Sequence, residues 1–170
     1  DNVTIPNSVE TIGEYAFAWC SSLTDITLSG NLTSIGAYAF RSCSSLDNVT
    51  IPNSVETIGE YAFAACSSLT DITLPEGITT IKDSLFIQCT SLESITMPSS
   101  LTSIEGYAFQ NCTSLNNVIV PNGVTSIDQY AFSKCSSLTD ITLPNGITSF
   151  EEGLFWQSTS LESITIPDSV

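Results

Sequence analysis

The sequence has no histidine and only three basic residues, against 18 acidic ones, among its 170 residues. The absence of histidine removes the commonest general base and the commonest metal ligand of proteins. The net charge of −15 disfavours nucleic acids and anionic membrane surfaces as partners, because both are bound by clustered Lys and Arg. The excess of acidic residues favours a soluble, self-repelling surface that can attract cations or basic partners.

The sequence also lacks a long apolar run. No window approaches the roughly 18 consecutive apolar residues that cross a bilayer, so we expect no membrane insertion. The first ten residues, DNVTIPNSVE, have neither the basic n-region nor the apolar h-region of a signal peptide. We therefore expect either that no leader existed or that the chain is a mature or excised piece.

The motifs of known catalytic sites are missing as well. The sequence contains no G-x-S-x-G, no phosphate-binding P-loop and no H-E-x-x-H. A catalytic constellation breaks the symmetry of a repetitive chain, and here nearly every polar residue is accounted for by its place in a repeat. We expect no enzymatic activity and no cofactor.

Repetition at a period of 23 residues is the dominant feature of the chain. Three columns of the aligned repeats are almost invariant: Phe17, Phe40, Phe63, Phe86, Phe109, Phe132 and Phe155; Leu23, Leu46, Leu69, Leu92, Leu115, Leu138 and Leu161; and Ile12, Ile35, Ile58, Ile81, Ile104, Ile127 and Phe150. About seven repeats occupy residues 1–170, which we interpret as a single repeat domain. Because neither end has an atypical capping segment, we expect a piece of a longer array.

Each repeat has the pattern of one strand, one turn and one returning segment. In LTDITL, the aliphatic residues Ile26 and Leu28 alternate with polar ones, which predicts a half-buried strand. In EYAFAWC, the spacing of Phe17 and Cys20 predicts a short helical turn with one apolar face. A unit this small cannot bury its apolar side alone, so the units are expected to stack into a parallel sheet.

These residues resemble a known family. The pattern L-x-x-I-x-L at residues 23–28 is similar to the strand signature of leucine-rich repeats. The pattern IG-x-x-AF-x-x-C-x-x-L, repeated in fixed phase, resembles the BspA-like subclass of bacterial and protist surface proteins. The resemblance covers the whole chain and implies an α/β solenoid. That fold is a right-handed coil with a parallel β-sheet on its concave face and short helical turns on its convex face.

One position departs from the wider superfamily. Where leucine-rich repeats carry Asn or Cys after the strand, this chain has Ser or Gly in every repeat except at Asn31. Without an asparagine ladder, another group must bond the backbone at that bend. The all-hydroxyl columns that include Thr11 and Ser22 are our predicted substitute.

Six cysteines, at positions 20, 43, 66, 89, 112 and 135, fall in one column. Disulfides are disfavoured, because helical turns on a convex side are expected to lie beyond the roughly 7 Å Cα separation that a bridge allows. A metal site would need converging ligands, and a reactive thiol would need nearby positive charge. The seventh repeat has Ser158 in this column, which a packing position tolerates. We therefore expect all six sulfur atoms to be buried, unbonded and metal-free.

The outward residues of the predicted strands are the candidate binding surface, since solenoids commonly bind ligands on the concave sheet. These residues are Asp25, Thr27, Asn48, Thr50, Asp71, Thr73, Ser94, Thr96, Asn117, Ile119, Asp140 and Thr142. Exposed strands favour such residues by propensity alone, so the competing interpretation assigns this face no ligand. Ordered water on the threonine row and weak calcium binding on the acidic row are less favoured alternatives.

The resemblance implies a cell-surface or extracellular adhesin that engages host, matrix or partner-cell molecules. We expect a non-catalytic domain that binds a protein or glycan, and the alternative is a passive spacer or stalk. A binder should gather aromatic residues on one face of a few repeats, whereas a spacer should present equivalent faces. Trp19 and Trp156 replace small or polar residues, so we expect both rings to be partly exposed. The uncapped ends make end-to-end self-association a further expectation.

Overall fold

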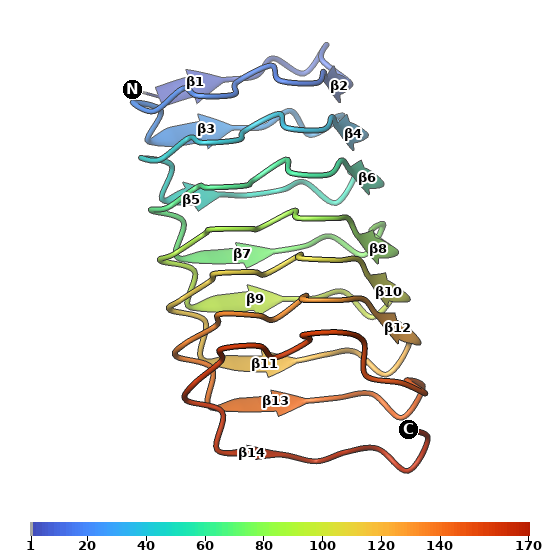
Figure 1. Ribbon diagram of the computed structural model, residues 1–170. Helices are drawn as coiled ribbons and strands as arrows, with labels where there is room; N and C mark the ends of the chain where they lie inside the picture. Colours follow the sequence, from blue (N-terminus) through green and yellow to red (C-terminus); the bar gives the residue numbers. More distant parts are fainter. Residues whose placement is uncertain (1) are drawn as a thin grey trace.

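The computed structural model describes residues 2–170 as a solenoid of about seven coils, stacked in a nearly straight column from one terminus to the other (Figure 1). One side is built from β1 (Asn2–Thr4), β3 (Asp25–Thr27), β5 (Asn48–Val49), β7 (Asp71–Thr73), β9 (Ser94–Thr96), β11 (Asn117–Ile119), β13 (Asp140–Thr142) and β14 (Ser163–Ile164). A second side is built from β2 (Thr11–Ile12), β4 (Ser34–Ile35), β6 (Thr57–Ile58), β8 (Thr80–Ile81), β10 (Ser103–Ile104) and β12 (Ser126–Ile127). Every strand pairing is parallel, which confirms the predicted parallel-strand solenoid.

The pairing register equals the sequence repeat. Asp25 pairs with Asn48, and Ile26 pairs with Val49, so each strand residue lies beside its equivalent in the next coil. Along the first side the hydrogen-bonded orders are β1-β3-β5, β7-β9 and β11-β13-β14. The alternation predicted from LTDITL is confirmed, because Ile26 is buried and its two neighbours are exposed.

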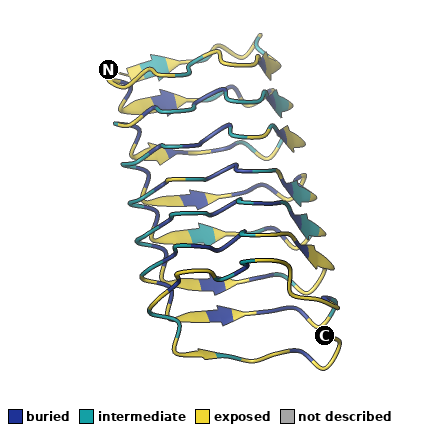
Figure 2. Cartoon of the chain, in the orientation of Figure 1, coloured by how far each residue is buried: buried dark blue, intermediate teal, exposed yellow. Residues whose placement is uncertain are grey.

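The core is a set of stacked columns running the length of the molecule (Figure 2). The seven phenylalanine rings stack in sequence, with centroids 5.1–6.1 Å apart. Phe40, Phe63, Phe86, Phe109 and Phe132 are fully buried. The isoleucine and leucine columns pack beside them, so the three predicted columns form the core except at Phe150, which is exposed. Each coil therefore buries its apolar side against equivalent residues of its neighbours.

The predicted short helical turns are wrong, because no helix occurs among residues 2–170. The segment that was expected to be helical, here called the turn segment, covers residues 14–20 of the first coil and the equivalent residues of the others. Alternate amides in this segment donate to different partners. The N–H groups of Ala16, Ala18 and Cys20 donate to carbonyls three residues earlier, whereas those of Tyr15, Phe17 and Trp19 donate to Ala37, Ala39 and Arg41 of the next coil at 2.7–3.1 Å.

Two residues in each turn segment adopt the left-handed conformation. In the first coil they are Tyr15 and Trp19, with φ of 57° and 61°, and the equivalent positions of later coils behave alike. A right-handed helix cannot contain such residues. An α-helix would also use its amides within the segment, leaving none to bond the next coil. The turn segment thus exchanges internal hydrogen bonds for bonds between coils.

The expectation that the turn segments lie farther apart than the strands is also wrong. Direct hydrogen bonds join successive coils on both sides of the solenoid, so the rise is about 4.8 Å per coil on both. Strong curvature of the sheet would require a larger spacing between coils on one side, and the hydrogen bonds keep the two spacings similar. We call the outward surface of β1, β3, β5, β7, β9, β11, β13 and β14 the sheet face, and that of the turn segments the turn face.

In three coils, a serine hydroxyl takes the place of the missing asparagine at the bend after the strand. Ser54, Ser100 and Ser169 stand at the Asn or Cys position of other leucine-rich repeats. Their hydroxyls donate to the carbonyls of Leu32, Ile78 and Ile147 in the preceding coil at 2.6–2.8 Å. Further hydroxyls, such as Thr102 to Thr79, bond the backbone of the preceding coil. These bonds come from the columns that contain Ser8 and Glu10, whereas we predicted the columns of Thr11 and Ser22.

Replacing Phe86 by alanine should lower the free energy of unfolding by about 3–5 kcal/mol, because the ring is fully buried and stacked on both sides. The matched control is Phe17→Ala, because Phe17 is only partly buried and stacks on a single ring, that of Phe40. Guanidinium titration of both variants measures the difference. A loss at Phe17 as large as the loss at Phe86 would contradict this account of the core.

Candidate functional site

All twelve predicted binding residues lie on the sheet face and are exposed. They form two parallel rows, here called the sheet-face rows. One row is Asp25, Asn48, Asp71, Ser94, Asn117 and Asp140, and the other is Thr27, Thr50, Thr73, Thr96, Ile119 and Thr142. The fold thus brings together residues that are 23 positions apart in sequence. Ile119 is the single apolar member, with 74% of its surface exposed.

The sheet face is hollowed beside β3, β5 and β7. One shallow hollow is lined by Asp25, Thr27, Asn48 and Thr50, together with Pro52. A second is lined by residues of β5 and β7 and by the loop that carries Pro52 and Asn53. Their linings include hydroxyl, carboxamide and carboxylate groups, which can hydrogen-bond a ligand that lies across neighbouring strands.

The cysteine column forms a hydrogen-bonded ladder inside the solenoid. In each coil from the second to the sixth, the Sγ–H donates to the phenylalanine carbonyl of the preceding coil at 3.1–3.2 Å, beginning with Cys43 to Phe17. Ser158 makes the same bond to Phe132 through its hydroxyl at 2.7 Å. The substitution that the sequence shows in the seventh repeat therefore preserves the interaction.

Burial of these thiols makes them unreactive. It raises the pKa of Cys43 to about 11 and the pKa of Cys89 and Cys135 to about 12. The pKa values of Cys66 and Cys112 are also raised by burial. Because the thiolate is the nucleophile, these residues do not form a reactive site near neutral pH.

One of the cysteine predictions is wrong. All six cysteines are free, but Cys20 is exposed whereas the other five are buried. Cys20 belongs to the first coil of the structure, so no preceding coil covers its sulfur or offers it a carbonyl. The sequence column is uniform, and the difference comes only from the position of the coil in the stack.

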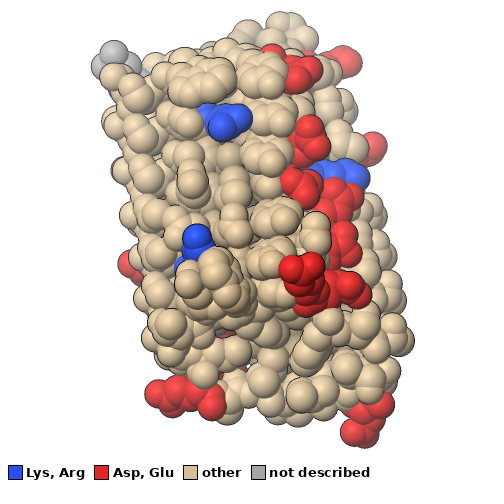
Figure 3. Space-filling model, in the orientation of Figure 1, with Lys and Arg blue, Asp and Glu red and all other residues tan. Residues whose placement is uncertain are grey.

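Carboxylates gather on the molecule in a band (Figure 3) that includes Asp83, Glu105, Asp128 and Glu151, and we call these four residues the acidic ridge. Lys82 pairs with Glu105 at 2.9 Å. Burial raises the pKa of Asp128, and the negative charges of Glu105, Glu151 and Asp83 raise it further. Within residues 2–170, no group of three or more His, Cys, Asp or Glu side chains is placed to hold a metal ion.

The turn face carries stacked aromatic rings. Tyr15, Tyr38 and Tyr61 stack with centroids 4.7 and 4.9 Å apart, and Trp19 stacks on Tyr15 at 6.1 Å. The guanidinium carbon of Arg41 lies 5.5–5.8 Å from the centroids of Trp19, Tyr38 and Tyr61. We call these five residues the aromatic cluster. The tyrosine stack recurs in later coils, where Tyr107 and Tyr130 lie 5.4 Å apart.

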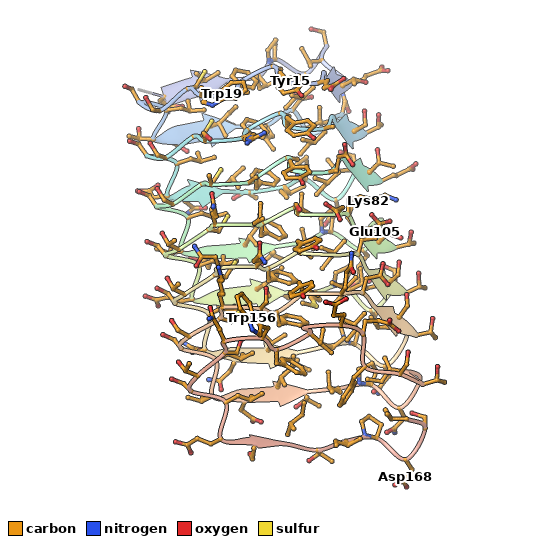
Figure 4. The ribbon with its side chains drawn as sticks, viewed as in Figure 1. Tyr15, Trp19, Lys82, Glu105, Trp156 and Asp168 are labelled. Atoms are coloured by element: carbon orange, nitrogen blue, oxygen red, sulfur yellow. The ribbon has the colours of Figure 1, made fainter. Side chains whose placement is uncertain are left out.

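A smaller aromatic group lies farther along the turn face (Figure 4). The ring of Trp156 lies edge-on to Tyr130, and the Lys134 ammonium lies 5.1 Å from its centroid. The expected partial exposure of both tryptophans is confirmed, with 59% of Trp19 and 49% of Trp156 accessible. Two of the three basic residues of the chain thus contact exposed indole rings.

A groove of about 590 Å³ runs along the turn face beside Trp19, and we call it the turn-face groove. It is lined by Trp19, Ser21, Ser42, Ser44, Ala65, Ser67, Gln88, Thr90 and Asn111. The exposure of Trp19 was predicted from the sequence, whereas the groove beside it was not. The sequence does contain an indication of the groove. The columns that begin at Trp19 and Ser21 continue with residues that are small or polar, which leave room at the surface.

Stacked parallel strands, columns of identical core residues and a turn segment in place of a helix define a leucine-rich-repeat solenoid. The chain belongs to the BspA type leucine rich repeat region family, whose profile matches in six copies over residues 1–116 and 57–170. No curated protein sequence matches the chain significantly. None of residues 2–170 forms a helix of the length and hydropathy needed to span a membrane.

Several solved structures of bacterial leucine-rich repeat proteins are similar. A protein from Eubacterium ventriosum has 29% identity and a TM-score of 0.89 over 99% of this chain, which spans only 45% of that protein. A leucine rich cell surface protein from Faecalibacterium prausnitzii has 27% identity and a TM-score of 0.64, covering 99% of this chain and 67% of that one. A leucine-rich repeat protein of T. pallidum has 28% identity and a TM-score of 0.61, with coverage of 94% and 66%.

The folded chain of residues 1–170 should expose one reactive thiol. We expect an aromatic disulfide reagent at pH 8 to label Cys20 quickly and the five buried cysteines only after unfolding, because burial raises their pKa values and blocks access. Absorbance of the released thiol measures the number of labelled groups. Cys20→Ser is the control and should leave no fast phase. Fast labelling of several thiols in the folded protein would contradict the buried ladder.

Proposed function

We propose that this chain is a non-catalytic binding domain of a bacterial cell-surface protein of the adhesin kind, which recognises a protein or glycan outside the cell. The observation that carries the proposal is the presence of two exposed indole rings, each beside a basic side chain, in an otherwise repetitive solenoid. The core columns repeat almost unchanged and tyrosine recurs on the turn face in five coils, whereas Trp19 beside Arg41 and Trp156 beside Lys134 each occur in one place. A passive spacer has no need for such asymmetry.

The energetics of Trp19 support a binding role. Its backbone is left-handed, a conformation that costs roughly 1–2 kcal/mol for a residue with a β-carbon and is least suited to bulky side chains. Ser42 and Ala65 occupy the same position in the next two coils with the same backbone conformation. The fold is therefore satisfied by a small side chain, and the exposed indole adds apolar surface that the core does not use.

The sheet-face rows are a second contact surface in this proposal. Their carboxylates, hydroxyls and carboxamides point outward from neighbouring strands, and two hollows lie among them. The charge of −15 favours a basic or neutral partner and disfavours nucleic acid. Location outside the cell is supported by family membership and by the relative that is described as a cell surface protein.

The binding role can be tested with the purified chain and a panel of purified extracellular-matrix proteins, neutral oligosaccharides and charged oligosaccharides. We expect saturable binding of at least one component by biolayer interferometry. For a protein ligand, added salt should weaken binding, because the rows are acidic. The double variant Asp71→Ala, Thr73→Ala should lower that affinity about ten-fold, the equivalent of about 1.4 kcal/mol.

The matched control is Asp168→Ala, which removes an exposed carboxylate that lies outside the rows (Figure 4). This variant should bind as the wild type does. If the wild type retains no component of the panel, the spacer interpretation replaces the binding role.

A further inference from the structure

We propose that the turn-face groove binds a neutral, extended oligosaccharide, with the indole of Trp19 as the stacking platform for one sugar ring. This inference rests on the proposed binding function and assigns it a site and a ligand class. It places the glycan contact on the turn face, away from the acidic sheet-face rows.

The groove is long, shallow and continuous across coils. Its lining residues come from five successive coils, so at about 4.8 Å per coil it extends roughly 20 Å along the solenoid axis. A groove of this form suits a linear chain of several rings that lies parallel to the axis. A compact ligand would leave most of the lining uncovered.

Trp19 forms one end of the groove and is held in place before any ligand arrives. Its ring is nearly parallel to that of Tyr15, with 3° between the planes, and the guanidinium of Arg41 lies 5.8 Å from its centroid. An aromatic ring that is fixed in this way loses little conformational entropy on binding. Sugar rings present an apolar face of C–H groups, which packs on the electron-rich face of an indole.

The remaining lining supplies hydrogen-bonding groups that match sugar hydroxyls. Ser67 and Thr90 donate their hydroxyl protons to backbone carbonyls of the preceding coil, so their oxygen lone pairs are left to accept. Among residues 2–170, the side-chain carboxamides of Gln88 and Asn111 bond no other protein group, and each offers both a donor and an acceptor. The groove thus combines one aromatic platform with a row of neutral polar groups.

The charges favour a neutral glycan over other ligands. No lining residue carries a charge, and Arg41, which lies beside Trp19, is stacked over aromatic rings and does not line the groove, so the groove offers no ion pair to a sulfated or sialylated chain. The net charge of −15 also disfavours anionic glycans. A basic peptide would be attracted to the acidic ridge rather than to this groove. An extended peptide would also need unpaired backbone groups, whereas the turn-segment amides already bond within their own coil or to the next one.

The experiment uses defined neutral oligosaccharides of linked glucose, mannose or N-acetylglucosamine units, with sialylated and sulfated chains for comparison. The test variant is Trp19→Ser, which introduces the residue found at the equivalent position 42. The matched control is Trp156→Ser, which removes the other exposed indole, outside the groove, and introduces the residue found at position 133. Trp156→Ser also leaves Trp19 as the sole tryptophan, so its fluorescence reports a ligand at that ring.

We expect at least one neutral chain to bind the wild type and to change the Trp19 fluorescence of Trp156→Ser with the same Kd. Trp19→Ser should weaken that binding at least about ten-fold, and Gln88→Ala should weaken it to a smaller extent. Added salt should have little effect, because no ion pair forms. Guanidinium titration should show that both tryptophan variants fold with similar stability.

Equal binding by Trp19→Ser and the wild type would overturn the inference, as would binding of charged chains alone or of no oligosaccharide. These outcomes leave the binding function intact if the matrix-protein panel yields a ligand that depends on the sheet-face rows. If neither oligosaccharides nor matrix proteins bind, the inference and the proposed function both fail.

Discussion

The backbone hydrogen bond between successive turn segments is the constraint on which the rest of this structure depends. Because every second amide of the segment donates to the next coil, the turn face has the same rise as the strands. That common rise brings equivalent phenylalanine rings into contact at 5.1–6.1 Å and keeps the solenoid nearly straight (Figure 1). Helices at this position would have separated the rings and widened one side.

Because the rise is uniform, interior and surface positions are under different constraints on residue type. Inside, each position meets its own equivalent above and below, so one residue type can serve every coil, as in the phenylalanine and cysteine columns. Outside, a side chain has no such partner requirement and can differ between coils. Trp19 is an example of such a difference between coils. Its backbone has the same left-handed conformation as that of Ser42 at the equivalent position of the next coil.

The sequence predicted the parts of the fold that depend on side-chain burial. The alternation of Ile26 with polar neighbours and the three apolar columns were sufficient for the strands and the core. The conformation of the turn segment could not be predicted in this way, because the inward spacing of Phe17 and Cys20 suits a helical turn and a run of tight turns equally. Its left-handed positions are mostly occupied by residues such as Tyr15 rather than glycine, so the residue types did not indicate a left-handed backbone there. The turn-face groove depends on two columns lying side by side at a known rise, which only the three-dimensional structure provides.

The hydrogen bonds of the cysteine ladder all point the same way along the solenoid axis. Thiols donate to the coil before them, while turn-segment amides donate to the coil after them, so each internal coil gives and receives the same set of bonds. A whole coil can therefore be added or removed without leaving a buried donor unmatched, whereas a change of a few residues shifts every ladder out of phase at once. Such a chain is modular in steps of one repeat, and its outer surface can be lengthened or rearranged by exchanging coils while the interior stays the same.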